Sequence, residues 1–182
     1  MRRITAFIIF TLLSINGSAA LDRASGKKGI LPGASAKDPL DIDAGKLEFF
    51  DAEQKLVYTG SVIVKNGPST LKSSGLIIFL DPKAASAAST NGTSSQRVNH
   101  VEADGPVTLV TPDAIYTGDH ATYDKKSNKV FLKGHVTLTQ GETVVKGDTM
   151  EYDLNTSQGQ VHSAGQQGSR VKSIFTPGSQ QK

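Results

Sequence analysis

The sequence predicts an all-β protein whose strands form antiparallel hairpins, and the main evidence is an internal repeat. Residues 101–124 (VEADGPVTLVTPDAIYTGDHATYD) and 130–153 (VFLKGHVTLTQGETVVKGDTMEYD) share one order of Val, Gly, Val, Leu, Gly and a final Tyr-Asp. Gly105 and Gly134 lie 29 residues apart, and a second glycine follows each of them after 13 residues. A period near 30 with alternating apolar positions is typical of stacked hairpins.

The repeat extends in both directions along the chain. Upstream, residues 57–81 place Gly60 and Gly75 in the same roles, and downstream the pattern continues as far as Gly165. The distance from Gly60 to Gly105 is 45 residues, and most of the excess over one period coincides with the low-complexity tract 82–97. That tract is predicted to be a surface loop inserted into an otherwise regular ladder.

The segments on either side of the repeat have different compositions. Residues 1–20 combine a basic start, an apolar stretch and a small-residue site, so they predict a signal peptide cleaved after Ala20, with an uncleaved anchor as the alternative. The protein is therefore expected to be exported. Residues 21–38 are expected to form a flexible lead-in, residues 39–176 the single folded domain, and residues 177–182 a tail.

Within the domain, apolar and polar residues alternate in segments of about 6 to 10 residues that end at tight polar turns. The first segment, 40–44, has Leu40, Ile42 and Ala44 on one face. Turns are expected at Asp51–Lys55, Asn66–Pro68, Thr111–Asp113, Asp124–Asn128, Gln140–Gly141 and Asn155–Gly159.

Composition argues against several classes of function. Without Arg2 and Arg3, 18 basic residues face 17 acidic ones, and no basic run or aromatic stacking motif suggests nucleic-acid binding. The chain has no cysteine, so its stability depends on strand pairing and burial. The four histidines have no spacing typical of metal ligands, and no nucleophile elbow or P-loop is present. We therefore expect no enzyme activity and no cofactor.

The alternation predicts a continuous apolar row along the stack. In the second repeat, Val130, Leu132, Gly134, Val136 and Leu138 share one face, and the opposite face is mostly polar. On the return strands the apolar parity changes at Gly75, Gly118 and Gly147, which we interpret as a glycine bulge at each place. Two interpretations remain open at this point: a closed sandwich core, or two sheets that stay apart and line a groove for an apolar ligand.

The same residues resemble a known family. Residues 40–64 (LDIDAGKLEFFDAEQKLVYTGSVIV), followed by the two repeats, are similar in order and total length to the OstA-like domain family of LptA-type lipopolysaccharide transport proteins. The likeness covers about residues 40–165, and the chain departs from it after Gly165, where apolar residues become few.

This resemblance implies a V-shaped β-jellyroll, open along its length, that carries lipopolysaccharide across the periplasm. It also implies head-to-tail self-association and docking to an inner-membrane anchored jellyroll partner and an outer-membrane barrel partner. The residues expected to line the groove for the lipid A acyl chains are Val62, Val64, Ile78, Leu80, Val107, Leu109, Ala121, Tyr123, Val136, Leu138, Met150 and Tyr152. The residues expected at the docking edges are Leu40, Ile42, Ala44, Val171, Ile174 and Phe175.

Two other hypotheses belong to different classes of function. The first is a structural or adhesive β-repeat scaffold with a closed, dry core. The second is a carbohydrate-active enzyme, which would need carboxylates clustered on one face, whereas the carboxylates of this sequence are scattered.

Overall fold

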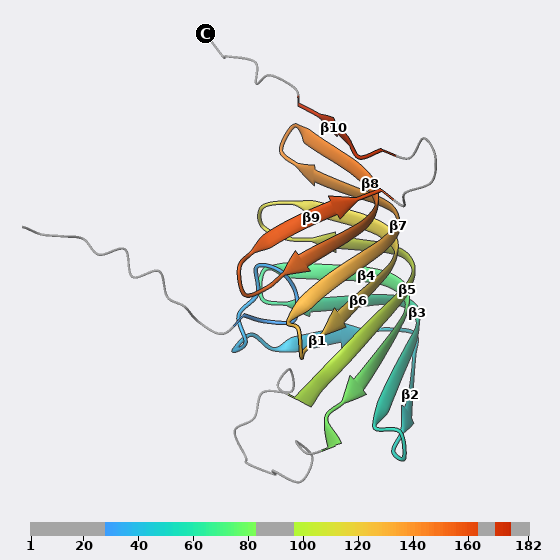
Figure 1. Cartoon of the computed structure of the whole chain (residues 1–182). Coiled ribbons are helices and arrows are strands. Elements are labelled where there is room, and N and C mark those ends of the chain that lie inside the picture. The colour runs from blue at the N-terminus through green and yellow to red at the C-terminus, as the bar shows by residue number, and fades with distance from the viewer. Residues whose placement is uncertain (1–27, 83–96, 164–169, 176–182) are drawn as a thin grey trace, which may run out of the picture.

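A computed structural model describes residues 28–82, 97–163 and 170–175, which form one open antiparallel sheet (Figure 1). The all-β prediction is confirmed. The predicted signal peptide, most of the 82–97 loop, Gly165 and the 177–182 tail lie outside the described residues. The strands are β1 (Leu40–Asp43), β2 (Lys46–Phe50), β3 (Lys55–Asn66), β4 (Ser69–Leu80), β5 (Val98–Val110), β6 (Ile115–Asp124), β7 (Lys129–Gln140), β8 (Thr143–Asp153), β9 (Gln158–His162) and β10 (Lys172–Ile174).

The sheet is a meander with a divided strand at each end. Strands β3 to β8 pair with their neighbours in chain order, and all pairings are antiparallel. At one end, β1 and β2 pair with different halves of β3; at the other, β10 and β9 pair with different halves of β8. Because no described strand joins the two ends, the sheet stays open.

The six central strands are longer than the segments of 6 to 10 residues that the sequence predicts. They contain 10 to 13 residues each. Each one continues through a register shift in its middle, and the sequence-based segments correspond to the two halves. The predicted turns lie where the strands end, for example at Gly67–Pro68 between β3 and β4.

The extra residue of each register shift lies on β3, β5 and β7, and this corrects the predicted position of the bulges. On β3, for example, Gly60 and Ser61 separate the paired residues Thr59 and Val62, whereas only one residue separates their partners on β4. The glycines on the bulged strands, Gly60, Gly105 and Gly134, have φ of +87°, +86° and +75°. The return-strand glycines Gly75, Gly118 and Gly147, where the sequence places the bulges, do not have positive φ.

The physical reason for the difference is that these bulges are of the glycine type, in which a left-handed residue lies on the strand that carries the extra residue. On the return strands, the set of alternate residues that points inward changes at the position of the bulge. Tyr116 and Gly118 are buried before the shift, and Ala121 and Tyr123 are buried after it, as the parity argument expects.

The register shifts align across the sheet and divide it into two leaves. Leaf A comprises β1 with residues 62–73, 107–118, 136–147 and β10; leaf B comprises β2 with residues 55–59, 75–80, 98–104, 120–133, 149–153 and β9. We call the line of shifts the spine. Figure 1 shows the long strands bent along this line, and the apolar faces of the two leaves pack against one core cluster.

Residues 28–38 differ from the expected flexible lead-in, because they pack on the domain. Ile30, Leu31 and Ala34 are 4–6% exposed and belong to the core cluster. The folded part therefore begins before residue 39. Sequence periodicity does not reveal this, since the segment makes no strand of the sheet and is held by contacts with residues more than 30 positions away.

The bulges generate the first prediction. A Cβ at Gly105 would lie 2.6 Å from Ser74 Cβ in addition to the unfavourable φ of +86°, whereas Gly141 has φ of +55° and nothing within 4 Å. Gly105→Ala should lower the free energy of unfolding by about 3 kcal/mol or more, and Gly141→Ala by about 1 kcal/mol. Urea denaturation measures both values, and equal losses would contradict a closely packed spine.

Candidate functional site

The twelve residues predicted to line the groove lie on the inner faces of both leaves. Leaf A supplies Val62, Val64, Val107, Leu109, Val136 and Leu138, and leaf B supplies Ile78, Leu80, Ala121, Tyr123, Met150 and Tyr152. Nine of them are at most 9% exposed, and Leu80, Leu138 and Tyr152 are partly buried against the same cluster. The structure therefore brings all twelve together, six from each leaf.

Sequence reasoning missed other members of this inner surface. Leu71 and Leu76 of β4 are 5% and 2% exposed; Leu76 shares the parity of Ile78, and Leu71 shares that of Ser73 on the other side of the register shift. Leu56 and Tyr58 of β3 also face inward. The alternation could have found these four. It could not have found Ile30 and Leu31, which lie on no strand.

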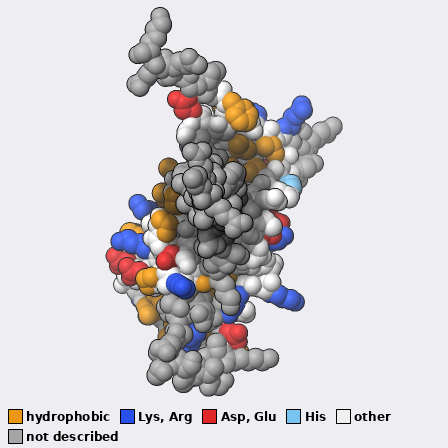
Figure 2. Space-filling view, turned by 90° about the vertical axis from the view of Figure 1, so that its left-hand side faces the viewer, with side chains coloured by type: hydrophobic (Ala, Val, Ile, Leu, Met, Phe, Trp, Pro, Cys, Tyr) orange, Lys and Arg blue, Asp and Glu red, His pale blue; other side chains and the backbone are white. Residues whose placement is uncertain are grey.

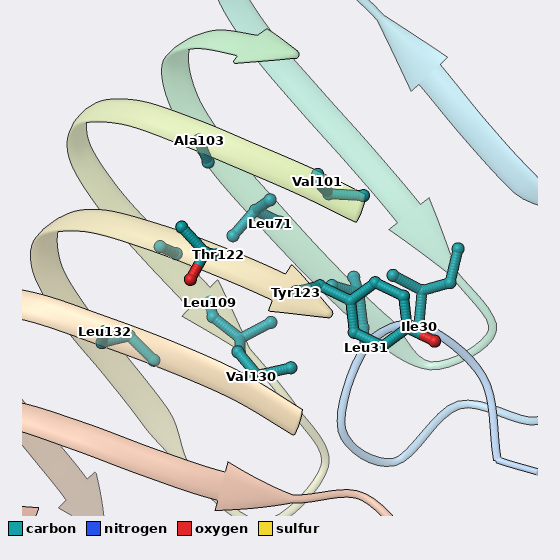
Figure 3. A pocket seen from close by; sticks show the side chains of 11 residues that line it. Ile30, Leu31, Leu71, Val101, Ala103, Leu109, Thr122, Tyr123, Val130 and Leu132 are labelled. Atoms are coloured by element: carbon teal, nitrogen blue, oxygen red, sulfur yellow. The ribbon is translucent and has the colours of Figure 1, made fainter. Parts of the chain in front are cut away.

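The space between the leaves varies along the stack. At the β1/β2 end, a cavity of about 180 Å³ is lined by residues of both leaves and by Arg97. It includes the predicted groove residues Ile78 and Leu80 together with the predicted edge residues Leu40 and Ile42. Farther along the stack, a cavity of only about 30 Å³ remains between Leu71 and Leu109 of leaf A and Val101, Tyr123 and Val130 of leaf B (Figure 3). That is the volume of about one water molecule, so an acyl chain does not fit there without a rearrangement.

The inner surface continues onto exposed residues at the β1/β2 end. Leu47 and Phe49 pair directly with Tyr58 and Leu56, and residues opposite each other in neighbouring strands project from the same face. Leu47 is 53% exposed and Phe49 is 54% exposed, so the apolar surface continues past β3 into solvent.

The predicted docking residues lie at the two ends of the sheet. Leu40 and Ile42 belong to β1, and Ala44 follows it directly. Val171 precedes β10, Ile174 ends it and Phe175 follows; these three are 40%, 59% and 73% exposed. Beyond their single pairing with β3 or β8, β1 and β10 pair with no other described strand.

The outer face is mostly polar, and so are the turns. His120 contacts Asp104 at 2.8 Å and His135 contacts Asp119 at 2.7 Å, both beside the spine. The hydrogen bond that the His135 imidazole donates to the Asp119 carboxylate raises the pKa of His135. Charged side chains of both signs are also spread over the face drawn in Figure 2, without a large area of one sign.

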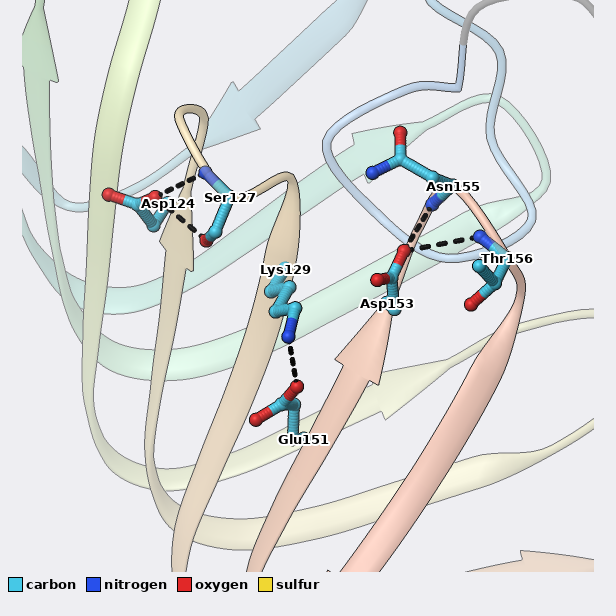
Figure 4. A network of polar contacts seen from close by, with 7 residues as sticks. All are labelled: Asp124, Ser127, Lys129, Glu151, Asp153, Asn155 and Thr156. Carbon is cyan, nitrogen blue, oxygen red and sulfur yellow. Dashed lines mark hydrogen bonds and ion pairs between the residues drawn. The ribbon is translucent and has the colours of Figure 1, made fainter.

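The turn carboxylates have structural roles. Asp124 accepts hydrogen bonds from the backbone and hydroxyl of Ser127, and Asp153 accepts them from the backbone of Asn155 and Thr156 (Figure 4). These bonds lower the pKa of both carboxyl groups.

Among the described residues, no group of three or more His, Asp or Glu side chains is placed to hold a metal ion. In the same part of the chain, no helix is long and apolar enough to cross a bilayer.

Comparisons with known proteins agree with this geometry. Residues 41–163 match the model of the family described as LptA/(LptD N-terminal domain) LPS transport protein. The fold is similar to the crystal structure of LptH, the LptA homologous periplasmic component of the lipopolysaccharide transport device from Pseudomonas aeruginosa. The TM-score is 0.62 at 21% identity, covering 80% of this chain and 100% of the other.

A sequence relative is an uncharacterized protein of Rhizobium meliloti (strain 1021), 31% identical over 96 residues. The match covers 53% of this chain and 50% of the relative, so the chain spans about half the length of that protein.

The packed interior generates a prediction about pH. Burial, with Tyr152 and Asp113 nearby, raises the pKa of Tyr116 to about 12, whereas an unfolded tyrosine ionises near pH 10. Between these values only the unfolded chain loses the proton, so stability falls as pH rises. From pH 9 to pH 11, the free energy of unfolding should fall by about 1 kcal/mol more in the wild type than in Tyr116→Phe. Denaturation at pH 9 and pH 11 measures these losses. Equal losses of unfolding free energy in the wild type and in Tyr116→Phe would show that the Tyr116 hydroxyl is in contact with water.

Proposed function

Because the chain belongs to the LptA/(LptD N-terminal domain) family of LPS transport proteins, we propose that it binds lipopolysaccharide and shields the acyl chains between its two leaves. It would act in the periplasm, after removal of the predicted signal peptide, and without catalysis. The observation that carries this proposal is the unbroken apolar surface that runs from the cavity at the β1/β2 end onto exposed Leu47 and Phe49.

The energetics favour a passive carrier. Burying about a dozen methylenes of one acyl chain contributes roughly 10 kcal/mol relative to water. Removing the acyl chain from a bilayer costs a similar amount of free energy. The free energy of transfer from bilayer to groove is therefore close to zero, and the groove alone gives the movement no direction. The sequence has no nucleotide-binding motif, so the direction of movement would come from an upstream partner.

The ends of the sheet support a bridging role. An edge strand presents unpaired N–H and C=O groups, which a strand from another molecule can pair with. We propose that β1 and β10 are the docking edges for head-to-tail copies of this chain. The same edges would accept the inner-membrane anchored jellyroll partner and the outer-membrane barrel partner. Stacking in this way would join the apolar groove of one domain to that of the next.

One observation favours the alternative of a closed structural scaffold. The cavity of about 30 Å³ between Leu71, Leu109 and Tyr123 is far smaller than an acyl chain. A scaffold of this kind would bind no lipid in a saturable way, and Leu138→Asp would unfold it. A lipid carrier would keep its fold in that variant, because its leaves need not close tightly on each other, and would lose lipid binding.

Photo-crosslinking tests which face meets the lipid. Benzoylphenylalanine at Leu138 or Tyr152 should capture lipopolysaccharide, because both residues lie on the inner surface. Phe131 and Lys133 of β7 have the opposite parity and serve as outer-face controls. Labelling at the inner positions should exceed that at the controls by at least tenfold. Similar labelling of both faces would refute a groove-bound lipid.

Self-association tests the docking edges. Ile174→Asp introduces a charge at the last residue of β10, where the apolar side chain is 59% exposed. It should weaken self-association at least tenfold, as measured by native mass spectrometry over a range of concentrations. Ile115→Asp is the matched control, because Ile115 is 43% exposed but belongs to β6 in the middle of the sheet. An equal effect of both variants, or of neither, would argue against docking through β10.

A further inference from the structure

Residues 28–35 form a short strap that is separate from the sheet. Lys28 and Ser35 make an isolated bridge, Gly29 N donates to Ala34 O at 2.9 Å, and Ala34 N donates to Leu31 O at 3.1 Å. The loop therefore satisfies part of its backbone internally and pairs with no strand of the sheet. Gly33 has φ of +84°, which allows the tight reversal.

Two polar side chains at the β3–β4 turn hold the strap. Asn66 Oδ1 accepts hydrogen bonds from Ile30 N at 3.1 Å and Leu31 N at 3.4 Å, and Ser69 Oγ donates to Pro32 O. Both anchors are 0% exposed. They lie at the free end of leaf A, so release of the strap would let water reach them. Undocking would then leave no buried polar group without a partner.

The strap lies across the opening between the leaves. Ile30 and Leu31 point toward Leu71 and Tyr123 and line the cavity of about 30 Å³ (Figure 3). Tyr123 stands next to the β6–β7 turn, at the free end of leaf B. The strap thus connects the two free ends, and its Ile30 and Leu31 help to fill this section of the groove, where a cavity of only about 30 Å³ remains.

We propose that the Ile30 and Leu31 side chains occupy the position that an acyl chain would take between the leaves. The strap undocks when lipid enters this section of the groove. The inference rests on the proposed lipid-carrying function. Its physical basis is that an acyl chain can replace the apolar contacts of Ile30, Leu31 and Ala34 by contacts of the same kind. Ala44, Ala114 and Leu154 of the same cluster also lie outside the strands, but each directly adjoins one, whereas the strap pairs with no strand of the sheet and can leave without breaking a strand pair.

Hydrogen exchange on the mature, full-length chain tests the movement. Deuterium uptake is followed with and without lipopolysaccharide and, separately, with a fluorescent sixteen-carbon fatty acid. Exchange of the Ile30, Leu31 and Ala34 amides should become at least tenfold faster at saturation, whereas that of residues 69–80 should stay constant or slow down. Unchanged or slower exchange of the strap amides, with bound lipid confirmed by native mass spectrometry, would overturn the proposal.

Two variants undock the strap by different routes. A Cβ at Gly29 would lie 2.7 Å from both Ala34 Cβ and Asn66 Oδ1, so Gly29→Val displaces the strap without changing either leaf. Asn66→Ala removes the main anchor. Both variants should bind the fatty acid about five- to tenfold more tightly than the wild type. The exposed Lys37 provides a control, Lys37→Ala, that should leave affinity unchanged.

The outcomes separate this proposal from the function on which it rests. Weaker fatty-acid binding by Gly29→Val would show that the strap is part of the lipid site. It would overturn the proposal that the strap and an acyl chain exclude each other. Binding by Gly29→Val alone would support a strap that blocks the wild type. If neither the wild type nor the folded variants bind lipid or fatty acid, the lipid-carrying function fails, and this proposal fails with it.

Discussion

The structure depends on one repeated constraint, which is the extra residue in the middle of β3, β5 and β7. Gly60, Gly105 and Gly134 adopt left-handed backbone there, and the three register shifts line up. Without them the six long strands would form one continuous sheet with an apolar face in water. With them the sheet bends along the spine, and its two halves cover each other's apolar side chains. Every property of the groove follows from this bend.

A bent, open sheet leaves apolar surface uncovered wherever the leaves do not meet. In one section the strap covers it with Ile30 and Leu31, and at the β1/β2 end it remains exposed at Leu47 and Phe49. Unpaired edge strands accompany the exposed surface at that end. Exposed apolar side chains beside an unpaired strand edge commonly mark a surface that meets another molecule. Their coincidence is what a domain that continues into another domain would need, and it links the groove to the proposed docking edges.

The sequence could predict the parts that repeat, because repetition and alternation are local signals. The two copies at 101–124 and 130–153, with the related residues 57–81, identify the long strands, their turns and all twelve inner-face residues. The strand that carries each bulge was predicted wrongly, since both strands of every hairpin contain a glycine and only the backbone angle distinguishes them. The strap was missed for another reason. Its burial depends on Asn66 and Ser69, more than 30 residues away, and such a contact has no period.

Backbone hydrogen bonds hold the sheet together, whereas side-chain contacts hold the two leaves against each other. This difference explains how such a domain could open without unfolding. The strand ladders run along each leaf and across the spine, so the leaves are joined by continuous strands. Separating the leaves at their free ends therefore breaks no backbone hydrogen bond of the sheet. It removes only contacts between apolar side chains, and those are the contacts that an acyl chain supplies. A ligand of this chemistry would replace what it displaces, and the hydrogen-bonded sheet would keep its register throughout.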